Sequence, residues 1–207
     1  MSQEVYELIK RMDREKIETH LVIQCAPMIS GIKISNLLIV ERSMAAQVRR
    51  VLNRSGISYF LLLENEEKVT YLLYHKEELK EYLNEENVCR YMRHFGYENL
   101  ELSAVLNQFR KRYEDYMNQK AGFPHEMGLL LGYPVEDVEG FIENEGRNYL
   151  YSGYWKVYDH VEEKRALFAR YEEARKLLLQ FLAQGLNVKD MVLKSKKNLV
   201  LTAGCSA

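Results

Sequence analysis

The order of apolar and polar residues at the start of the chain indicates a helix followed by a strand. Apolar residues recur at helical intervals over residues 3–12, which predicts a helix. Residues 19–24 are a β-branched and apolar run that predicts a strand. Cys25 then lies at the end of this strand, directly before Ala26 and Pro27.

Residues 36–74 predict a small sheet. Apolar runs over residues 36–40 and 57–63 predict two buried strands, and an amphipathic pattern over residues 42–54 predicts a helix between them. This order is compatible with a right-handed parallel unit. Residues 69–74 resume the apolar pattern after a short polar turn, which predicts an antiparallel hairpin with the preceding strand. The expected sheet is therefore mixed.

From residue 76 onward the pattern becomes mostly helical. Helices are predicted over residues 76–82, 86–95, 103–118 and 161–183. Six of the eleven glycines lie between Gly122 and Gly153, so the most demanding backbone geometry is expected there. Five aromatic residues surround a Ser-Gly pair within residues 147–158, a pattern that is typical of a β-hairpin.

The segment from Glu126 to Val138 has the pattern of a helix-turn-helix. Gly128 is small, Gly132 follows four residues later at the turn, and Val138 is placed to pack between the helices. The sequence thus predicts an α+β protein. It has an N-terminal mixed β-sheet with helices, and a helical C-terminal half that contains the helix-turn-helix-like pair and the aromatic hairpin.

We expect one domain over residues 1–185, followed by a basic tail over residues 186–207. The tail contains four lysines against one aspartate. It is expected either to be flexible or to add an edge strand at residues 199–202.

The composition is that of an ordinary globular protein. The 207 residues include 29 Lys and Arg against 30 Asp and Glu, a formal net charge of -1, and 47% are hydrophobic. No apolar run approaches the ~18 residues that cross a bilayer. The first residues lack the pattern of a secretory signal. We therefore expect a cytoplasmic protein without a membrane partner.

The charge pattern of the helix-turn-helix-like pair argues against a nucleic-acid partner. The second helix and the residues just beyond it carry five acidic residues between positions 136 and 145. This stretch contains no lysine or arginine, and the next basic residue is Arg147. These carboxylates would repel phosphates instead of neutralising them. A packing or partner-docking role is the expected one for this pair.

A thiol-dependent enzyme is one candidate function. Cys25, His125 and Asn144 follow the chain order of a papain-like hydrolase, with Cys25 as nucleophile and His125 as base. The local signatures of such enzymes are missing, and a small buried residue is the alternative role for Cys25. His125-Glu126 also begins like a zinc-binding H-E-x-x-H motif, but Leu129 replaces the second histidine. The cysteines are odd in number and form no C-x-x-C pair, so no metal site is predicted.

Binding of a ligand or a protein is the other main candidate, because glycines, aromatic rings and polar groups concentrate in one stretch. The candidate contacts share a charged, polar or stacking side chain near the expected cleft. They are Lys33, His125, Glu126, Arg147, Trp155 and Lys156. The alternative for the aromatic residues is ordinary core or cross-strand packing.

Several motifs resemble those of a bacterial family of uncharacterised proteins, a domain of unknown function found chiefly in anaerobes. The matching motifs are Cys25-Ala26-Pro27, Phe123-Pro124-His125-Glu126-Met127-Gly128, Gly132-Tyr133-Pro134 and Gly153-Tyr154-Trp155-Lys156-Val157-Tyr158. The resemblance covers most of residues 15–175 and implies no reaction, ligand or catalytic residue. Met28 stands where the family pattern leads us to expect a hydroxyl residue.

The sequence therefore favours a ligand-binding or protein-interaction module. Its cleft is expected between the Cys25 strand end and residues 123–158. The alternatives are a thiol-dependent enzyme and an adaptor that presents an acidic surface to a basic partner. The ligand, which is either a small molecule or a protein, and any cofactor stay open.

Overall fold

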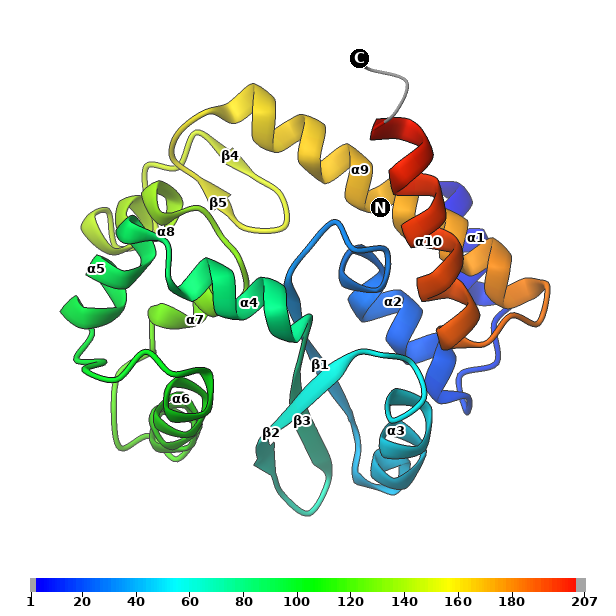
Figure 1. The fold of residues 1–207 in the computed structure, drawn as a ribbon, viewed down its shortest axis with the longest axis horizontal. Helices are drawn as coiled ribbons and strands as arrows, with labels where there is room; N and C mark the ends of the chain where they lie inside the picture. Colours follow the sequence, from blue (N-terminus) through cyan, green and yellow to red (C-terminus); the bar gives the residue numbers. More distant parts are fainter. Residues whose placement is uncertain (1–2, 204–207) are drawn as a thin grey trace.

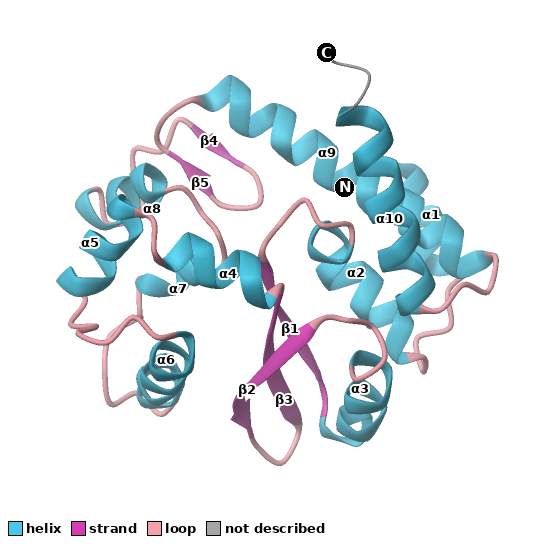
Figure 2. Cartoon of the chain, in the orientation of Figure 1, coloured by secondary structure: helices cyan, strands magenta, loops and turns pink. Residues whose placement is uncertain are grey.

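The computed structural model describes residues 3–203, with side chains described for residues 4–195. Helices dominate it and the strands form two small sheets (Figure 2). In chain order the elements are α1 (Gln3–Lys10), α2 (Ile17–Ile29), β1 (Ser35–Glu41), the 3-10 helix η1 (Arg42–Met44), α3 (Ala45–Leu52), β2 (Ser58–Glu64), β3 (Lys68–Tyr74), α4 (Lys76–Leu83), α5 (Glu86–His94), α6 (Leu102–Met117), α7 (Glu126–Leu130), α8 (Val135–Glu143), β4 (Tyr151–Ser152), β5 (Lys156–Val157), α9 (Val161–Ala183) and α10 (Val188–Ala203). The predicted α+β class is confirmed.

The larger sheet is antiparallel throughout, so the expectation of a mixed sheet was wrong. Its strand order is β1-β3-β2, and β3 is antiparallel to both neighbours. The strands predicted over residues 36–40, 57–63 and 69–74 and the β2–β3 hairpin are confirmed. β1 and β2 run in the same direction, as a strand-helix-strand unit requires, but β3 lies between them and removes the parallel pair.

The strand predicted over residues 19–24 is instead part of helix α2. Nine of the 13 residues of α2 are buried, because the helix contacts β1 and α9. A helix that is apolar nearly all round shows no helical period, and a short apolar run of that kind is easily mistaken for a buried strand. Pro27 lies in the last turn, two residues before the helix ends at Ile29.

The sheet separates two hydrophobic cores. Val69 and Tyr71 of β3 belong to the core that includes α2 and α3, whereas Leu72 belongs to the core that includes α6. Successive side chains of a strand point to opposite faces, so β3 serves both cores and is buried from Val69 to Tyr74. Figure 1 shows α3 and α6 on opposite sides of the sheet.

The basic segment after Gly185 continues as helix α10, so residues 199–202 are not an edge strand. Val188, Met191 and Val192 are buried in the first core, and α10 contacts α2. Lys189 and Lys194 are exposed, as expected for the polar side of an amphipathic helix. The predicted helices over residues 76–82, 86–95, 103–118 and 161–183 correspond to α4, α5, α6 and α9.

Candidate functional site

Helices α7 and α8 form the predicted helix-turn-helix-like pair, and glycines allow them to approach closely. A Cβ atom on Gly128 would lie 2.7 Å from Cγ2 of Val138, so a larger residue would push the helices apart. Gly132 has a φ of +70°, the left-handed conformation that ends α7. These are the roles that the sequence predicted for Gly128, Gly132 and Val138.

The aromatic hairpin of β4 and β5 is fastened to α8 by one buried carboxylate. Asp137 is 2% exposed. It accepts a hydrogen bond of 2.7 Å from Nε1 of Trp155 and another of 2.7 Å from the backbone N–H of Tyr158. Trp155 in turn stacks on Tyr133, with ring centroids 4.7 Å apart. The hairpin, α8 and the turn before α8 thus form one rigid wall.

A cavity of about 320 Å³, here called the aromatic cavity, lies between the helix pair and the hairpin. Most of its lining side chains are apolar or aromatic. They belong to Phe123, His125, Met127, Gly128, Leu131, Tyr133, Asp137, Val138, Phe141, Tyr154, Trp155 and Lys156. The volume is at the lower end of the range for small-molecule sites.

Most polar groups around the aromatic cavity are already paired within the protein. The Lys156 ammonium donates to the carbonyl of Gly146 at 2.6 Å, and the Tyr154 hydroxyl donates to Glu172 at 2.8 Å. Asp137 is satisfied by the hairpin. Two groups differ. The His125 ring contacts Phe123 and Phe141, and neither it nor the Tyr133 hydroxyl forms a hydrogen bond within the described part of the chain.

His125 is held in its neutral form. Burial lowers the pKa of His125 below its usual value, and the neighbouring Glu126 carboxylate opposes this only in part. A neutral imidazole carries one donor and one acceptor nitrogen. His125 can therefore exchange a hydrogen bond with a ligand without placing a charge in apolar surroundings.

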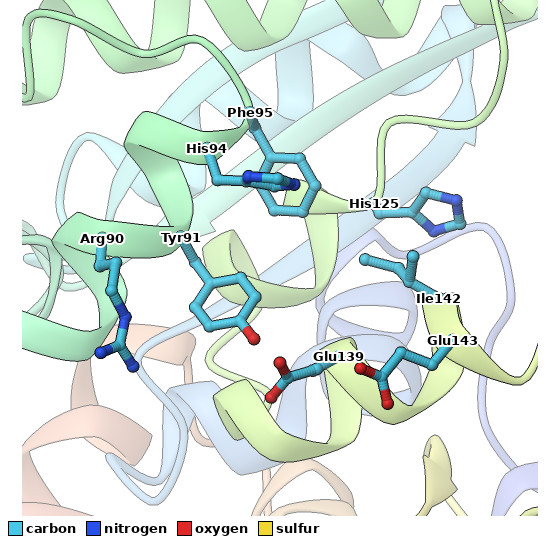
Figure 3. A pocket seen from close by; sticks show the side chains of 8 residues that line it. All are labelled: Arg90, Tyr91, His94, Phe95, His125, Glu139, Ile142 and Glu143. Atoms are coloured by element: carbon cyan, nitrogen blue, oxygen red, sulfur yellow. The ribbon is translucent and has the colours of Figure 1, made fainter.

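A second cavity of about 470 Å³ lies beside the first, between α5 and α8; we call it the α5–α8 cleft (Figure 3). His125 lines both cavities. The other lining residues differ sharply in chemistry from those of the aromatic cavity. They are Arg90, Tyr91, His94, Phe95, Glu139, Ile142 and Glu143.

Glu126, a predicted ligand contact, lines neither cavity. Its carboxylate is fully buried, accepts a hydrogen bond from the Tyr97 hydroxyl at 3.0 Å and pairs with Nε of Arg112 at 2.5 Å. Arg112 also donates to the carbonyl of Phe95. Glu126 therefore ties α7 to α6 and to the end of α5.

Two other predicted ligand contacts lie outside the cavity linings. Arg147 is exposed on the loop after α8. Lys33 is 7% exposed, donates to Oδ1 of Asn36 at 3.0 Å and lies 5.2 Å from the ring centre of Tyr133. Burial lowers the pKa of Lys33 to about 8. Tyr133 thus connects Lys33 to the wall of the aromatic cavity, which Trp155, Lys156 and His125 line directly.

The described contacts do not bring Cys25, His125 and Asn144 together. Cys25 lies in helix α2, fully buried, and its Sγ atom contacts Asn36 and the carbonyl of Leu37 at 3.6 Å each. Asn144 ends α8, where its side chain donates to the carbonyl of Gly140. Burial raises the pKa of Cys25 to about 12, so the thiol stays protonated at neutral pH. This environment is that of a structural cysteine.

The acidic residues between positions 136 and 145 are divided in their roles. Asp137 is buried and Glu136 pairs with Lys164 at 3.0 Å. Glu139, Glu143 and Glu145 are exposed. The adaptor hypothesis required an exposed acidic helix, and only part of the helix meets that condition.

Sequence reasoning missed the α5 side of the site. Tyr91 and Phe95 are four residues apart and therefore share a helix face, as do Glu139 and Glu143 of α8. This spacing was visible in the sequence. That the two faces meet follows only from the packing of α5 against α8 and α7.

Within residues 3–203, no three or more His, Cys, Asp or Glu side chains are grouped so that they could hold a metal ion. Over the same part of the chain, no helix is both long enough and apolar enough to cross a membrane.

Fold and site together define an α+β protein with an aromatic cavity at a helix-turn-helix-like pair. The chain belongs to the family described as "Protein of unknown function (DUF3793)", whose model matches residues 21–192. The match includes α5, α7, α8 and the hairpin. All residues that line the two cavities therefore lie within it. No curated protein and no solved structure matches the chain.

Proposed function

We propose that this protein binds a small, largely apolar ligand with an aromatic ring in the aromatic cavity. One observation carries the proposal: the cavity is walled by aromatic and aliphatic side chains, and its lining includes two polar groups, the His125 imidazole and the Tyr133 hydroxyl, that form no hydrogen bond within the described part of the chain. An apolar molecule that enters this space gains roughly 25 cal/mol for each Å² removed from water.

The fixed position of the cavity walls favours a ligand-binding role over a purely structural role for the aromatic side chains. Asp137 holds the hairpin, and Gly128 and Gly140 allow the closest approaches around α8. A preformed cavity spares a ligand the cost of ordering its site. Aromatic walls also favour flat rings, which stack or meet the wall edge to face.

Titration of the full-length protein with 3-ethylindole, followed by isothermal calorimetry, tests the proposal. This neutral two-ring probe is flat and largely apolar, and its N–H can donate to His125. We expect saturable binding to one site and a rise in the melting temperature, because the probe binds only the folded state.

A cavity-filling variant locates the binding site. Met127→Trp places a larger side chain in the aromatic cavity, whereas Met117→Trp makes the same change at an exposed position of α6. We expect Met127→Trp to weaken 3-ethylindole binding at least about tenfold and Met117→Trp to leave it unchanged. Equal binding by both variants, or no binding by the wild type, would refute the proposal.

A further inference from the structure

We infer that the ligand of the aromatic cavity carries an organic ammonium group on a short arm, and that this group occupies the adjoining α5–α8 cleft. The inference rests on the proposed function, because it places the ring of the same ligand in the aromatic cavity. It adds the charge and the shape of the molecule.

The two cavities adjoin at His125 and α8. The helix presents Val138 and Phe141 to the aromatic cavity, and Glu139 and Glu143 to the cleft. His125 lines both spaces. A ligand that passes beside the imidazole therefore meets apolar walls with one end and carboxylates with the other.

The carboxylates of the cleft lack a cationic partner. Glu139 and Glu143 are exposed and form no ion pair within the described part of the chain. Figure 3 shows the two carboxylates lying along α8, with that of Glu139 beside the Tyr91 hydroxyl. Burial and the neighbouring Glu139 carboxylate raise the pKa of Tyr91 to about 12. The neutral phenol leaves the negative charge of the carboxylate in place.

The one fixed cation of the cleft does not neutralise both acids. Nη2 of Arg90 donates to Oδ1 of Asn87 at 3.1 Å on the exposed side of α5. Among the lining residues, Arg90, Glu139 and Glu143 sum to a formal charge of -1. A monocation would balance this charge.

The opposite wall of the cleft is aromatic. Tyr91 and His94 of α5, and Phe95 directly after this helix, line the cleft on the side away from α8 (Figure 3). An ammonium group is attracted both by a carboxylate and by the negative face of an aromatic ring. A metal ion fits less well, because no group of three metal-binding side chains exists among the described residues. The lining therefore favours an organic cation.

Three indoles with the same ring and different charge test the inference by calorimetry. Tryptamine is the cation, 3-ethylindole the neutral analogue and indole-3-propionate the anion. We expect tryptamine to bind about tenfold more tightly than 3-ethylindole, and the anion to bind most weakly. Raising the ionic strength from about 0.01 to about 0.5 M should reduce only the advantage of the cation, because exposed charges are screened by salt.

Matched double variants locate the charge. Glu139→Gln with Glu143→Gln should reduce tryptamine binding to the level of 3-ethylindole and leave 3-ethylindole unchanged. Glu77→Gln with Glu81→Gln is the control. It removes two exposed acids at the same spacing from α4, outside both cavity linings. It should change no binding constant.

The outcomes separate the two proposals. If tryptamine and 3-ethylindole bind equally and the Glu139 and Glu143 changes affect neither, the ammonium inference is overturned and the proposed function stands. If the acidic changes weaken tryptamine but Met127→Trp affects no indole, the ligand does not use the aromatic cavity. Both proposals then fail, as they do if none of the three indoles binds.

Discussion

Removal of the Asp137 carboxylate is expected to detach the aromatic hairpin from α8. In Asp137→Ala, the indole N–H of Trp155 and the backbone N–H of Tyr158 both lose an acceptor at 2.7 Å. A hydrogen bond to a charged group contributes ~1.5–3 kcal/mol, and a buried donor left without a partner adds its desolvation cost. Tyr158 is partly accessible to water, which offsets some of this loss.

We therefore expect a loss of about 3 kcal/mol in the free energy of unfolding. In a chain of this size, that corresponds to a fall of roughly 6–12 °C in melting temperature. Asp137→Asn keeps one acceptor oxygen and should lose about half as much.

Trp155 provides the assay, because it is the single tryptophan of the chain. Urea unfolding followed by tryptophan fluorescence reports on the hairpin, and far-ultraviolet circular dichroism reports on the helices. Both transitions should shift to lower urea in Asp137→Ala. Glu143→Ala is the control, since its exposed side chain is on the same helix and its loss should cost under about 0.5 kcal/mol. A loss below about 1 kcal/mol for Asp137→Ala would refute the assigned role of the carboxylate.

Two other regions allow equally direct tests. In the native protein, Cys25 should resist iodoacetamide from neutral pH to pH ~10, because its pKa of about 12 leaves little thiolate. It should react once the protein is unfolded. Mass spectrometry of the peptides measures the labelling, and rapid labelling of the native protein would contradict the burial of Cys25. Gly140→Ala should destabilise the protein by about 1–3 kcal/mol, since a Cβ there would lie 2.5 Å from the Tyr158 ring. Gly122→Ala meets nothing within 4 Å and should be neutral in the same thermal melt; equal effects would refute the packing argument.

The sequence predicted elements whose pattern is local. The β2–β3 hairpin follows from two apolar runs around a short polar turn, and the α7–α8 pair follows from Gly128, Gly132 and Val138. The failures concern long-range contacts. Helix α2 was mistaken for a strand because β1 and α9 bury it on several sides, and the sheet was expected to be mixed because the position of β3 depends on pairing with β1.

The same distinction applies to the candidate site. His125, Trp155 and Lys156 were predicted near a cleft and do line the aromatic cavity, because they lie in the segment where glycines and aromatic rings concentrate. Glu126 was also predicted as a contact, but Arg112 and Tyr97 come from distant positions and bury it in an ion pair. A residue type indicates what a side chain can do, and its tertiary partners decide whether that capacity is already used.

Helix α8 serves two kinds of surface at once. Asp137 of α8 bonds to the hairpin, and Val138 and Phe141 line the aromatic cavity. Glu139 and Glu143 of the same helix line the cleft. A helix turns 100° per residue, so neighbouring positions must face different surroundings. In the sequence these positions form one acidic stretch, which suggested a single acidic surface. In the structure Asp137 anchors the hairpin and Glu136 pairs with Lys164, whereas the exposed Glu139, Glu143 and Glu145 form no ion pair within the described part of the chain. Of these three, Glu139 and Glu143 line the cleft, where they can meet a cation.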